Sequence, residues 1–394
     1  MKINSVYIGG WFQRTMLQLS EVYDFLRNGT SQLKLSKKKL EELRKNLEIG
    51  SIEYGVAGEE YVLFVTADHI HVKIFEDGLI VLHSDRVEEE TLFSDLEHIK
   101  DYYETKLSPA LNYIFSLGAP VPKELANIEN IYPYFVVCDK ASRDDIAELL
   151  SKTERQKYFE FDNKDYSVLR GDKYYFINNK KSAKNPYIER YIEEQVFIRE
   201  FKGQLHRYLN LHRIIWEKID AVKDRAKVRG SDVVKFSTKL ESYAKTVTLI
   251  DGRIRQMSTY ISTRERIAKE DADLREFLAI SGYRYETLRD TLQYIRDLWD
   301  MTRTYVNSAQ KLFDGIKQDI TSSSINSLTI VTSMSAGAAI LDLFTGSEPS
   351  FTTFGFVYFF ILALIGWIAT KLLQYVAEKR KYEISDVEID KNIK

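Results

Sequence analysis

Two apolar stretches near the C-terminal end constrain the fold of this 394-residue chain more than any other feature. They run from about Ile325 to Phe344 and from about Phe354 to Leu373, and no lysine or arginine lies between them. A helix of about twenty residues, at 1.5 Å of rise per residue, matches the roughly 30 Å hydrocarbon core of a membrane. A helix inside a globular domain is seldom apolar on every side over this length. The sequence therefore predicts two transmembrane helices within residues 321–375.

Basic residues on either side of the apolar stretches predict how these helices are oriented. Lys311 and Lys317 precede the first stretch, and a Lys-Arg-Lys run at 379–381 follows the second. Because basic residues concentrate on the cytoplasmic side of a membrane, both ends of the chain are expected in the cytoplasm. We therefore expect a multi-pass protein of the cell inner (plasma) membrane, with a short outer loop and a cytoplasmic tail over 376–394.

Residues 1–180 alternate between strand-like and helix-like patterns, which predicts a cytoplasmic α+β domain with a largely antiparallel sheet. Within this domain, the Asp-Gly pair at 77–78 is typical of a tight hairpin turn, because glycine supplies the positive φ that such a turn requires. His69 and His71 are expected on one face of a strand, and His83, beyond the turn, on the opposite face. Two histidines without a third ligand predict no metal site.

The polar, basic segment 178–186 marks the end of that domain, and helical patterns follow it almost without a break. Helices are expected over about 187–228 and 232–280. Gly230 lies between them and favours the end of one helix, and the Ser-Asp pair that follows it favours the start of the next. The sequence therefore predicts an antiparallel helical hairpin.

A heptad pattern of apolar and small residues begins near Leu288 and requires partner helices to cover it. Its positions are Leu292, Ile295, Trp299, Thr302, Val306, Ala309, Phe313, Ile316 and Ile320. The pattern continues into the first apolar stretch without a proline, which predicts one helix of about sixty residues, or some 90 Å. Packing against the two preceding helices explains part of this seam, and other copies of the chain are the expected partners for the rest. The helical hairpin and this stalk helix together occupy residues 187–320.

The two apolar stretches differ in polarity, which predicts different surroundings for them. Because polar groups in hydrocarbon must face protein or water, the first, hydroxyl-rich stretch is expected inside a bundle and the second, aromatic stretch outside it. The residues expected to line a pore are Asn326, Thr329, Ser333 and Gly337. Asp342 and Glu348 are expected at the outer mouth, where carboxylates would attract cations. The alternative is that small and hydroxyl residues only allow close packing of helices.

This layout resembles the CorA-like superfamily of divalent-cation transporters. The resemblance covers an α/β domain, antiparallel helices, one very long helix and a short outer loop between two spans. It implies a homopentamer in which the first spans line a cation pathway gated by the cytoplasmic domain, with magnesium as substrate or regulator. The family carries a Gly-Met-Asn or Gly-x-Asn tripeptide at the outer end of the first span. Here Gly346 is followed by Ser347 and Glu348, so no filter residue is carried over.

Two other functions stay open on the sequence alone. Divergent relatives of this layout suggest a membrane effector gated by a nucleotide signal in a type III CRISPR-type antiviral system. The residues that would bind such an anion are Lys180, Lys181, Lys184, Arg155 and Arg170. A further basic stretch, 223–229, is expected to be a solvated face. The other function is a non-conducting oligomeric membrane tether.

Composition and motifs exclude several classes of function. The formal net charge of −2 gives no support to a nucleic-acid partner. Cys138 is the only cysteine, which excludes an internal disulfide and a cluster of thiolate ligands. No phosphate-binding glycine loop and no nucleophile motif occurs in the sequence, so neither an enzyme nor a bound cofactor is expected.

Overall fold

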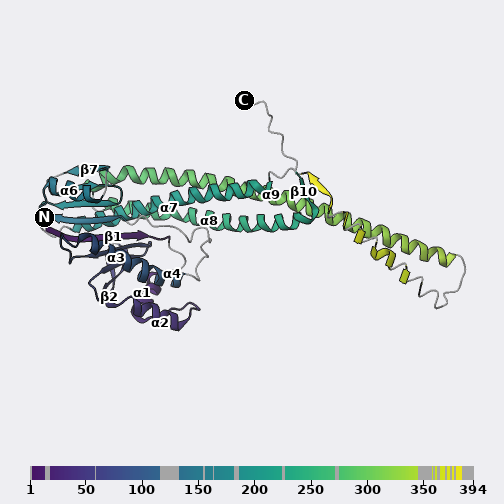
Figure 1. Ribbon diagram of the computed structural model, residues 1–394, viewed down its shortest axis with the longest axis horizontal. Coiled ribbons are helices and arrows are strands. Elements are labelled where there is room, and N and C mark those ends of the chain that lie inside the picture. The colour runs from purple at the N-terminus through teal and green to yellow at the C-terminus, as the bar shows by residue number, and fades with distance from the viewer. Residues whose placement is uncertain are drawn as a thin grey trace, which may run out of the picture. The chain divides into compact units, whose positions relative to one another are not determined.

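The computed structural model describes most of the chain, as two compact units. The described residues are 2–13, 18–57, 59–115, 133–153, 156–162, 164–181, 186–223, 227–270, 275–344, 357, 360, 361, 364–368, 371, 372, 375, 376 and 379–383. Unit 1 comprises residues 1–211 and 252–296, and unit 2 comprises residues 212–251 and 297–394. Figure 1 shows the chain coloured from its N-terminus to its C-terminus.

Unit 1 contains a nine-stranded sheet with the order β2-β3-β4-β5-β1-β6-β9-β8-β7. The strands are β1 (Lys2–Trp11), β2 (Ile49–Ala57), β3 (Glu59–Thr66), β4 (His71–Phe75), β5 (Leu79–Ser84), β6 (Tyr134–Asp139), β7 (Phe159–Asp162), β8 (Tyr166–Arg170) and β9 (Tyr174–Asn179). Neighbouring strands are antiparallel except β6 and β9, which are parallel. The expectation of an α/β domain with a largely antiparallel sheet is confirmed.

The central strand β1 separates two cores, because its side chains alternate between the faces of the sheet. Val6 and Ile8 belong to a hydrophobic cluster that includes the helices packed on one face. Those helices are α1 (Leu19–Asn28), α2 (Lys37–Asn46), α3 (Leu92–Asp101), the π-helix η1 (Tyr102–Leu107), α4 (Ser108–Phe115) and α6 (Arg143–Thr153). On the other face, Trp11 packs against Phe197 and Phe201 of a long helix, α7 (Pro186–Lys223).

Gly9 allows α7 to approach the sheet closely. A Cβ atom at this position would lie 2.5 Å from Val196 Cγ1 and 2.8 Å from the Ile80 carbonyl oxygen. The neighbouring Gly10 meets the Tyr103 hydroxyl on the opposite face, where a Cβ would lie 3.0 Å away. The glycine pair therefore serves packing on both faces of β1.

Two further long helices follow α7. They are α8 (Gly230–Glu270) and α9 (Arg275–Phe344), and α9 is continuous over 70 residues. In unit 2, α9 contacts both of the other long helices. The ring of Tyr305 on α9 stacks on the ring of Trp216 on α7, with centroids 4.5 Å apart. The Tyr305 hydroxyl donates to Asp220 Oδ1 at 2.9 Å, and Arg303 Nη1 lies 3.0 Å from Asp251 Oδ2. The long unbroken helix that the heptad pattern predicts is therefore present.

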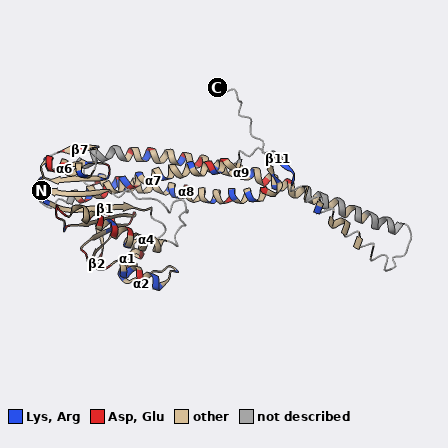
Figure 2. Cartoon of the chain, viewed as in Figure 1, with Lys and Arg blue, Asp and Glu red and all other residues tan. Residues whose placement is uncertain are grey.

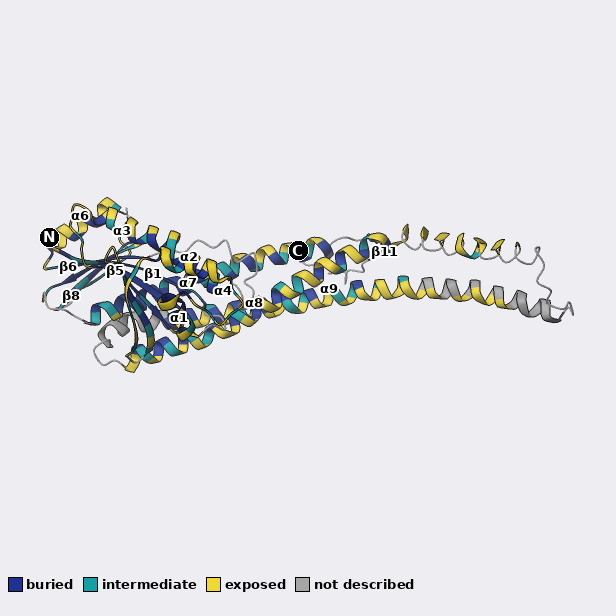
Figure 3. Ribbon diagram, turned by 90° about the horizontal axis from the view of Figure 1, so that it is seen from below, coloured by how far each residue is buried: buried dark blue, intermediate teal, exposed yellow. Residues whose placement is uncertain are grey.

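The heptad seam of α9 is buried over its first part only. The buried positions are Leu288, Leu292, Ile295, Trp299, Thr302, Val306, Ala309 and Phe313. At the last of them, the Phe313 ring lies 6.0 Å from Phe236 of α8. Ile316 and Ile320 are only half-buried. Every later residue of α9 whose burial is described is exposed (Figure 3). Burial of the seam is therefore complete up to Phe313 and partial at the two positions that follow.

The prediction of two transmembrane helices is wrong for the part of the chain that the structure describes. There, every helix is too short or too polar to cross a bilayer. The first predicted span forms the end of α9, where hydroxyl side chains such as Thr329 and Ser333 interrupt the apolar surface. Half of the second, 354–373, lies outside the described residues, as does the loop between them. The expected fold class, with two C-terminal spans, and the expected multi-pass inner-membrane localisation are both contradicted.

We expect Gly9→Ala to lower the free energy of unfolding by about 1–3 kcal/mol, because the added methyl group overlaps Val196. The matched control is Gly252→Ala in α8, where a Cβ would meet nothing within 4 Å. That change should raise stability by about 0.5–1 kcal/mol, through helix propensity alone. Urea unfolding followed by circular dichroism measures both, and equal effects of the two changes would contradict the close approach of α7.

Candidate functional site

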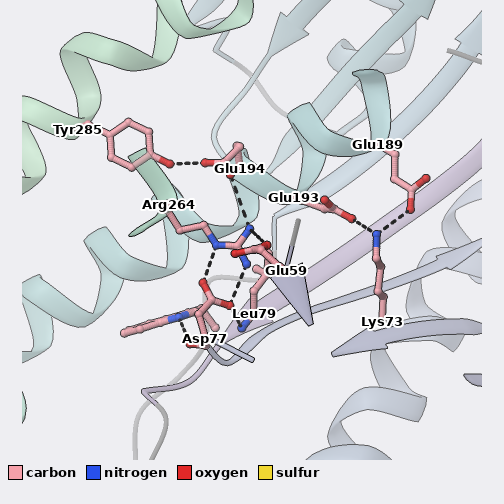
Figure 4. A network of polar contacts seen from close by, with 10 residues as sticks. Glu59, Lys73, Asp77, Leu79, Glu189, Glu193, Glu194, Arg264 and Tyr285 are labelled. Atoms are coloured by element: carbon pink, nitrogen blue, oxygen red, sulfur yellow. Dashed lines mark hydrogen bonds and ion pairs between the residues drawn. The ribbon is translucent and has the colours of Figure 1, made fainter. Parts of the chain in front are cut away.

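The most unusual polar feature of unit 1 is a buried arginine, Arg264 of α8, which is 1% exposed. Its Nε lies 2.5 Å from Asp77 Oδ2 and its Nη2 donates to Asp77 Oδ1 at 2.8 Å (Figure 4). The third nitrogen, Nη1, lies 3.0 Å from Glu59 Oε2 and 3.6 Å from Glu194 Oε1. One guanidinium thus faces three carboxylates, of which Asp77 and Glu194 are buried and Glu59 is partly exposed, and its geometry with Asp77 is bidentate.

A second cation extends the network along the sheet. Lys73 Nζ lies 2.7 Å from Glu193 Oε1 and 3.6 Å from Glu189 Oε1 (Figure 4). The Tyr285 hydroxyl donates to Glu194 Oε2, and so brings α9 into the cluster. The network therefore joins β3, β4, the β4–β5 turn and the three long helices.

The turn between β4 and β5 holds Asp77 in place. Its Oδ1 accepts the backbone N–H of Leu79 at 3.1 Å, and its carbonyl oxygen accepts the indole N–H of Trp11 at 3.0 Å. Gly78 adopts a φ of 90°, which an L side chain would resist. The β4–β5 turn therefore holds the Asp77 carboxylate independently of Arg264.

Aromatic rings fill the space around Arg264. The guanidinium carbon lies 5.0 Å from the centre of the Phe75 ring and 5.7 Å from that of Phe197. These contacts favour a cation and exclude water from the ion pairs. Charge interactions are stronger in such a site than at the surface.

The network contains more carboxylates than cations, and bound protons can compensate for the excess negative charge. Burial raises the pKa of Glu59 to about 7 and that of Glu194 to about 7, although the positive charge of Arg264 opposes both shifts. For Arg264 itself, burial disfavours the charge, but the carboxylates of Asp77 and Glu59 outweigh it and raise its pKa well above the usual value. Arg264 therefore stays charged, whereas Glu59 and Glu194 change protonation near neutral pH.

Burial and charge also shift the pKa values of the ion pair between Lys73 and Glu193. Burial raises the pKa of Glu193, against the opposing effect of Lys73. Burial also disfavours the Lys73 cation, but Glu193 more than offsets this and raises the lysine pKa. The arrangement can therefore bind protons and transmit a change of charge. Within its described residues, no nucleophile lies beside a base.

Two histidines lie beside the network, in an arrangement opposite to the one the sequence predicts. His71 pairs with His83 across the β4–β5 ladder, and their rings stack with centroids 4.5 Å apart. Tyr7 stacks on His83 from β1, at 5.0 Å. His69 has a positive φ of 59° and lies outside β4, so it shares no strand face with His71. Burial and the adjacent His71 lower the pKa of His83 to about 4.

The expectation that His83 faces away from His71 is thus wrong, and the cause is the turn. The ladder pairs Ile74 with Ile80, so the turn is centred on Asp77 and not between Asp77 and Gly78. A shift of one residue in register moves every side chain to the other face. Among the described residues no group of three or more metal-binding side chains is assembled.

The residues expected to line a pore lie on α9 or outside the described part of the chain. Thr329 and Ser333 are exposed, and the Thr329 hydroxyl donates to the Ile325 carbonyl oxygen at 2.9 Å. Asn326, Gly337 and Asp342 belong to α9, but their side chains are outside the described residues, as is all of Glu348. A pore stripe and an acidic outer mouth therefore stay predictions.

The residues expected to bind an anion are not brought together as a free basic site. Lys180 lies against Asp162, and Lys181 Nζ lies 2.6 Å from Asp165 Oδ1. The Arg170 guanidinium lies 5.4 Å from the centre of the Tyr175 ring. The other two, Arg155 and Lys184, are outside the described residues. The two described lysines are neutralised within the chain.

Sequence reasoning missed Arg264, although its position carries a detectable pattern. Seven positions of α8 recur at alternating spacings of three and four and are almost completely buried: Val247, Ile250, Ile254, Met257, Ile261, Arg264 and Ala268. An arginine within such an apolar stripe needs buried acidic partners, because burying an unpaired charge is costly. The stripe predicts that partners exist, but not which carboxylates they are.

Comparison with known proteins adds no relative. No family model matches the sequence, and no curated protein matches it significantly. The resemblance to CorA-like transporters therefore stays an expectation based on layout.

We expect Arg264→Met to lower the free energy of unfolding by about 3–5 kcal/mol at pH 8, because three carboxylates lose their buried counter-charge. The loss should be smaller at pH 5 than at pH 8, because Glu59 and Glu194, whose pKa values are about 7, take up protons over this range. Arg266→Met, an exposed position two residues further along α8, should change stability by less than about 0.5 kcal/mol. Chemical unfolding of both variants at pH 5 and pH 8 measures this, and a pH-independent loss would contradict the ionic account.

The raised pKa values of Glu59 and Glu194 predict that stability falls as pH rises. The folded protein binds these protons more tightly than the unfolded chain, whose glutamates titrate near 4.5. The stabilisation is fully present below that pH and is lost as pH rises through about 7. Each group should contribute a slope of up to about 1.4 kcal/mol per pH unit within this window.

Glu59→Gln and Glu194→Gln should each flatten that slope, because glutamine mimics the protonated acid at every pH. The exposed Glu217→Gln in α7 is the matched control and should leave the slope unchanged. Thermal melting of full-length protein from pH 4.5 to pH 8.5 measures all three variants. Slopes that match the parent protein in both network variants would show that these glutamates are charged throughout.

Proposed function

We propose that this chain is a non-enzymatic, homo-oligomeric coupling protein, in which C-terminal helices assemble with those of other copies. In this proposal the ionic network of unit 1 sets the state of α8 and α9, and oligomerisation depends on that state. The observation that carries the proposal is the heptad seam of α9, which is buried up to Phe313 and only half-buried at the next two positions, Ile316 and Ile320.

The seam changes its surroundings along one unbroken helix. Up to Phe313 its apolar positions are buried, with Phe236 of α8 among the partners. Beyond that point Ile316 and Ile320 keep the same spacing but are only half-buried. A seam with heptad spacing packs knobs into holes of a facing helix, so another copy of α9 would complete it.

Exposed apolar side chains beyond α9 also require a partner. Ten described residues in the region 357–376 are between 46% and 65% exposed: Val357, Phe360, Ile361, Leu364, Ile365, Trp367, Ile368, Leu372, Tyr375 and Val376 (Figure 3). Covering one such side chain contributes about 1.5–3 kcal/mol when burial is complete. A surface of this kind is typical of an interaction site. Other copies of the chain are the occupant to which we commit, because the α9 seam calls for the same partner.

The ionic network is placed to influence the same helices. Arg264 belongs to α8, and Tyr285 lies on α9, the helix that carries the seam. Protonation of Glu194 would change its hydrogen bond with Tyr285 and its attraction to Arg264. A change of charge in unit 1 would therefore act directly on two helices that also take part in assembly. The pentameric state, ion conduction and nucleotide gating stay predictions of the sequence.

We expect Ile316→Glu with Ile320→Glu to convert the oligomer into a monomer, because two carboxylates on the seam oppose helix pairing. The half-buried positions lie beyond the intrachain core, so the circular dichroism spectrum should not change. The control places the same charges beside the seam, at the exposed Lys317→Glu and Thr321→Glu, and should leave the oligomer intact. Sedimentation velocity of the full chain measures mass directly.

A parent protein that sediments as a monomer at all concentrations would contradict the proposal. If that monomer associates with lipid vesicles through the apolar residues at 357–376, lipid and not a second copy is the partner that covers them.

A further inference from the structure

A short β-ribbon in unit 2 brings together two basic segments that are far apart in the sequence. Strand β10 (Lys227–Arg229) pairs antiparallel with strand β11 (Lys381–Glu383). The N–H of Gly230, the first residue of α8, donates to the Arg380 carbonyl oxygen at 3.1 Å and extends the pairing. The ribbon and the residue before β11 thus concentrate lysine and arginine at one place (Figure 2).

The pairing register sets two cations opposite each other. Arg229 is the direct partner of Lys381, and both side chains are exposed. The intervening pair, Val228 and Tyr382, points to the other face, and Val228 is 2% exposed. The ribbon therefore has one side with Val228 and Tyr382 and another with Arg229 and Lys381. The pair Lys227 and Glu383 shares this second face by register, so the face carries three basic residues and one acidic residue.

A like-charge pair directly across a ribbon is unfavourable and needs a compensating group. Among the described residues no carboxylate forms an ion pair with Arg229 or Lys381. The same holds for the neighbouring Lys379 and Arg380, whose cations lie over tyrosine rings at 4.4 Å and 5.7 Å. Four cations thus lie within a few residues of one another without a described counter-charge.

We propose that the exposed face of the β10–β11 ribbon binds a phosphate-bearing anion. The Arg229 guanidinium can form two parallel hydrogen bonds to phosphate oxygens, and the Lys381 ammonium supplies a mobile point charge beside it. An anion between them converts the repulsive pair into two attractive contacts. Two cations facing each other suit a phosphate group, which offers several oxygens and can carry more than one negative charge, better than a single carboxylate.

This site differs from the anion site expected on the sequence. Lys180 and Lys181 are paired with carboxylates of unit 1, whereas the ribbon lies in unit 2. The sequence predicts a solvated face at 223–229, and no local pattern indicates that residues 227–229 pair with the strand at 381–383. The inference does not depend on the oligomeric function proposed above.

Binding is tested with the full chain by isothermal titration calorimetry, using sodium pyrophosphate and ATP as soluble probes. A parallel arm uses co-sedimentation with phosphatidylcholine vesicles, with and without phosphatidylglycerol. Binding to the soluble probes assigns a free phosphate compound, and binding only to anionic vesicles assigns a lipid phosphate. Absence of binding in both arms overturns the proposal.

Arg229→Gln with Lys381→Gln should weaken binding at least about tenfold, because two charged contacts are lost. The matched control, Lys218→Ala with Lys239→Ala, removes two exposed lysines from α7 and α8 of the same unit and should change affinity less than about twofold. Arg229→Lys with Lys381→Arg keeps the charges and should retain most of the affinity. Equal weakening in the matched control would show non-specific attraction and would overturn the site.

Asp232→Asn guards against a variant that merely fails to fold. Asp232 lies in the first turn of α8, three positions after Arg229, and its negative charge opposes an incoming anion. Removal of this charge should tighten binding about two- to fivefold, a gain that loss of structure cannot produce. Weaker binding by a folded Asp232→Asn protein would contradict the proposed position of the ligand.

Discussion

The structure of unit 1 depends on the ion pair between Arg264 and Asp77. Each partner is held by other parts of the fold. The Leu79 N–H holds the Asp77 carboxylate, the Trp11 indole holds the Asp77 carbonyl oxygen, and the apolar stripe of α8 places the guanidinium. The pair is buried among aromatic rings, where neither charge has water as an alternative partner. Formation of this ion pair therefore requires α8 to pack against the sheet.

The excess of carboxylates gives this centre its chemical character. A balanced buried pair is inert, whereas Glu59 and Glu194 add two groups that a single guanidinium cannot neutralise. Protons make up the difference, and the pKa values near 7 follow from the charge count and burial together. Because Tyr285 ties Glu194 to α9, proton uptake and helix position are linked through one hydrogen bond.

Along α9 the same sequence pattern has two outcomes. Up to Phe313 the heptad positions are buried within the chain, and at Ile316 and Ile320 they are only half-buried. The pattern specifies that a helix face must be covered, and it does not specify by what. The predicted spans show the same ambiguity, since an apolar or weakly polar helix surface is consistent with lipid or with protein partners. The prediction of membrane-crossing helices took lipid as the partner, and the described structure contradicts this prediction.

Local physics determined what the sequence could predict by itself. Alternation of side chains predicted the sheet, the Asp-Gly pair predicted the hairpin, and the heptad spacing predicted the continuous helix α9. Tertiary structure alone decided which groups meet. A single residue in the turn brought His71 and His83 to one face, long-range packing chose Asp77 as the partner of Arg264, and strand pairing brought Lys381 to Arg229. Periodicity fixes which face of an element is buried, but the contacts across that face depend on chain segments far apart in sequence, which no local pattern encodes.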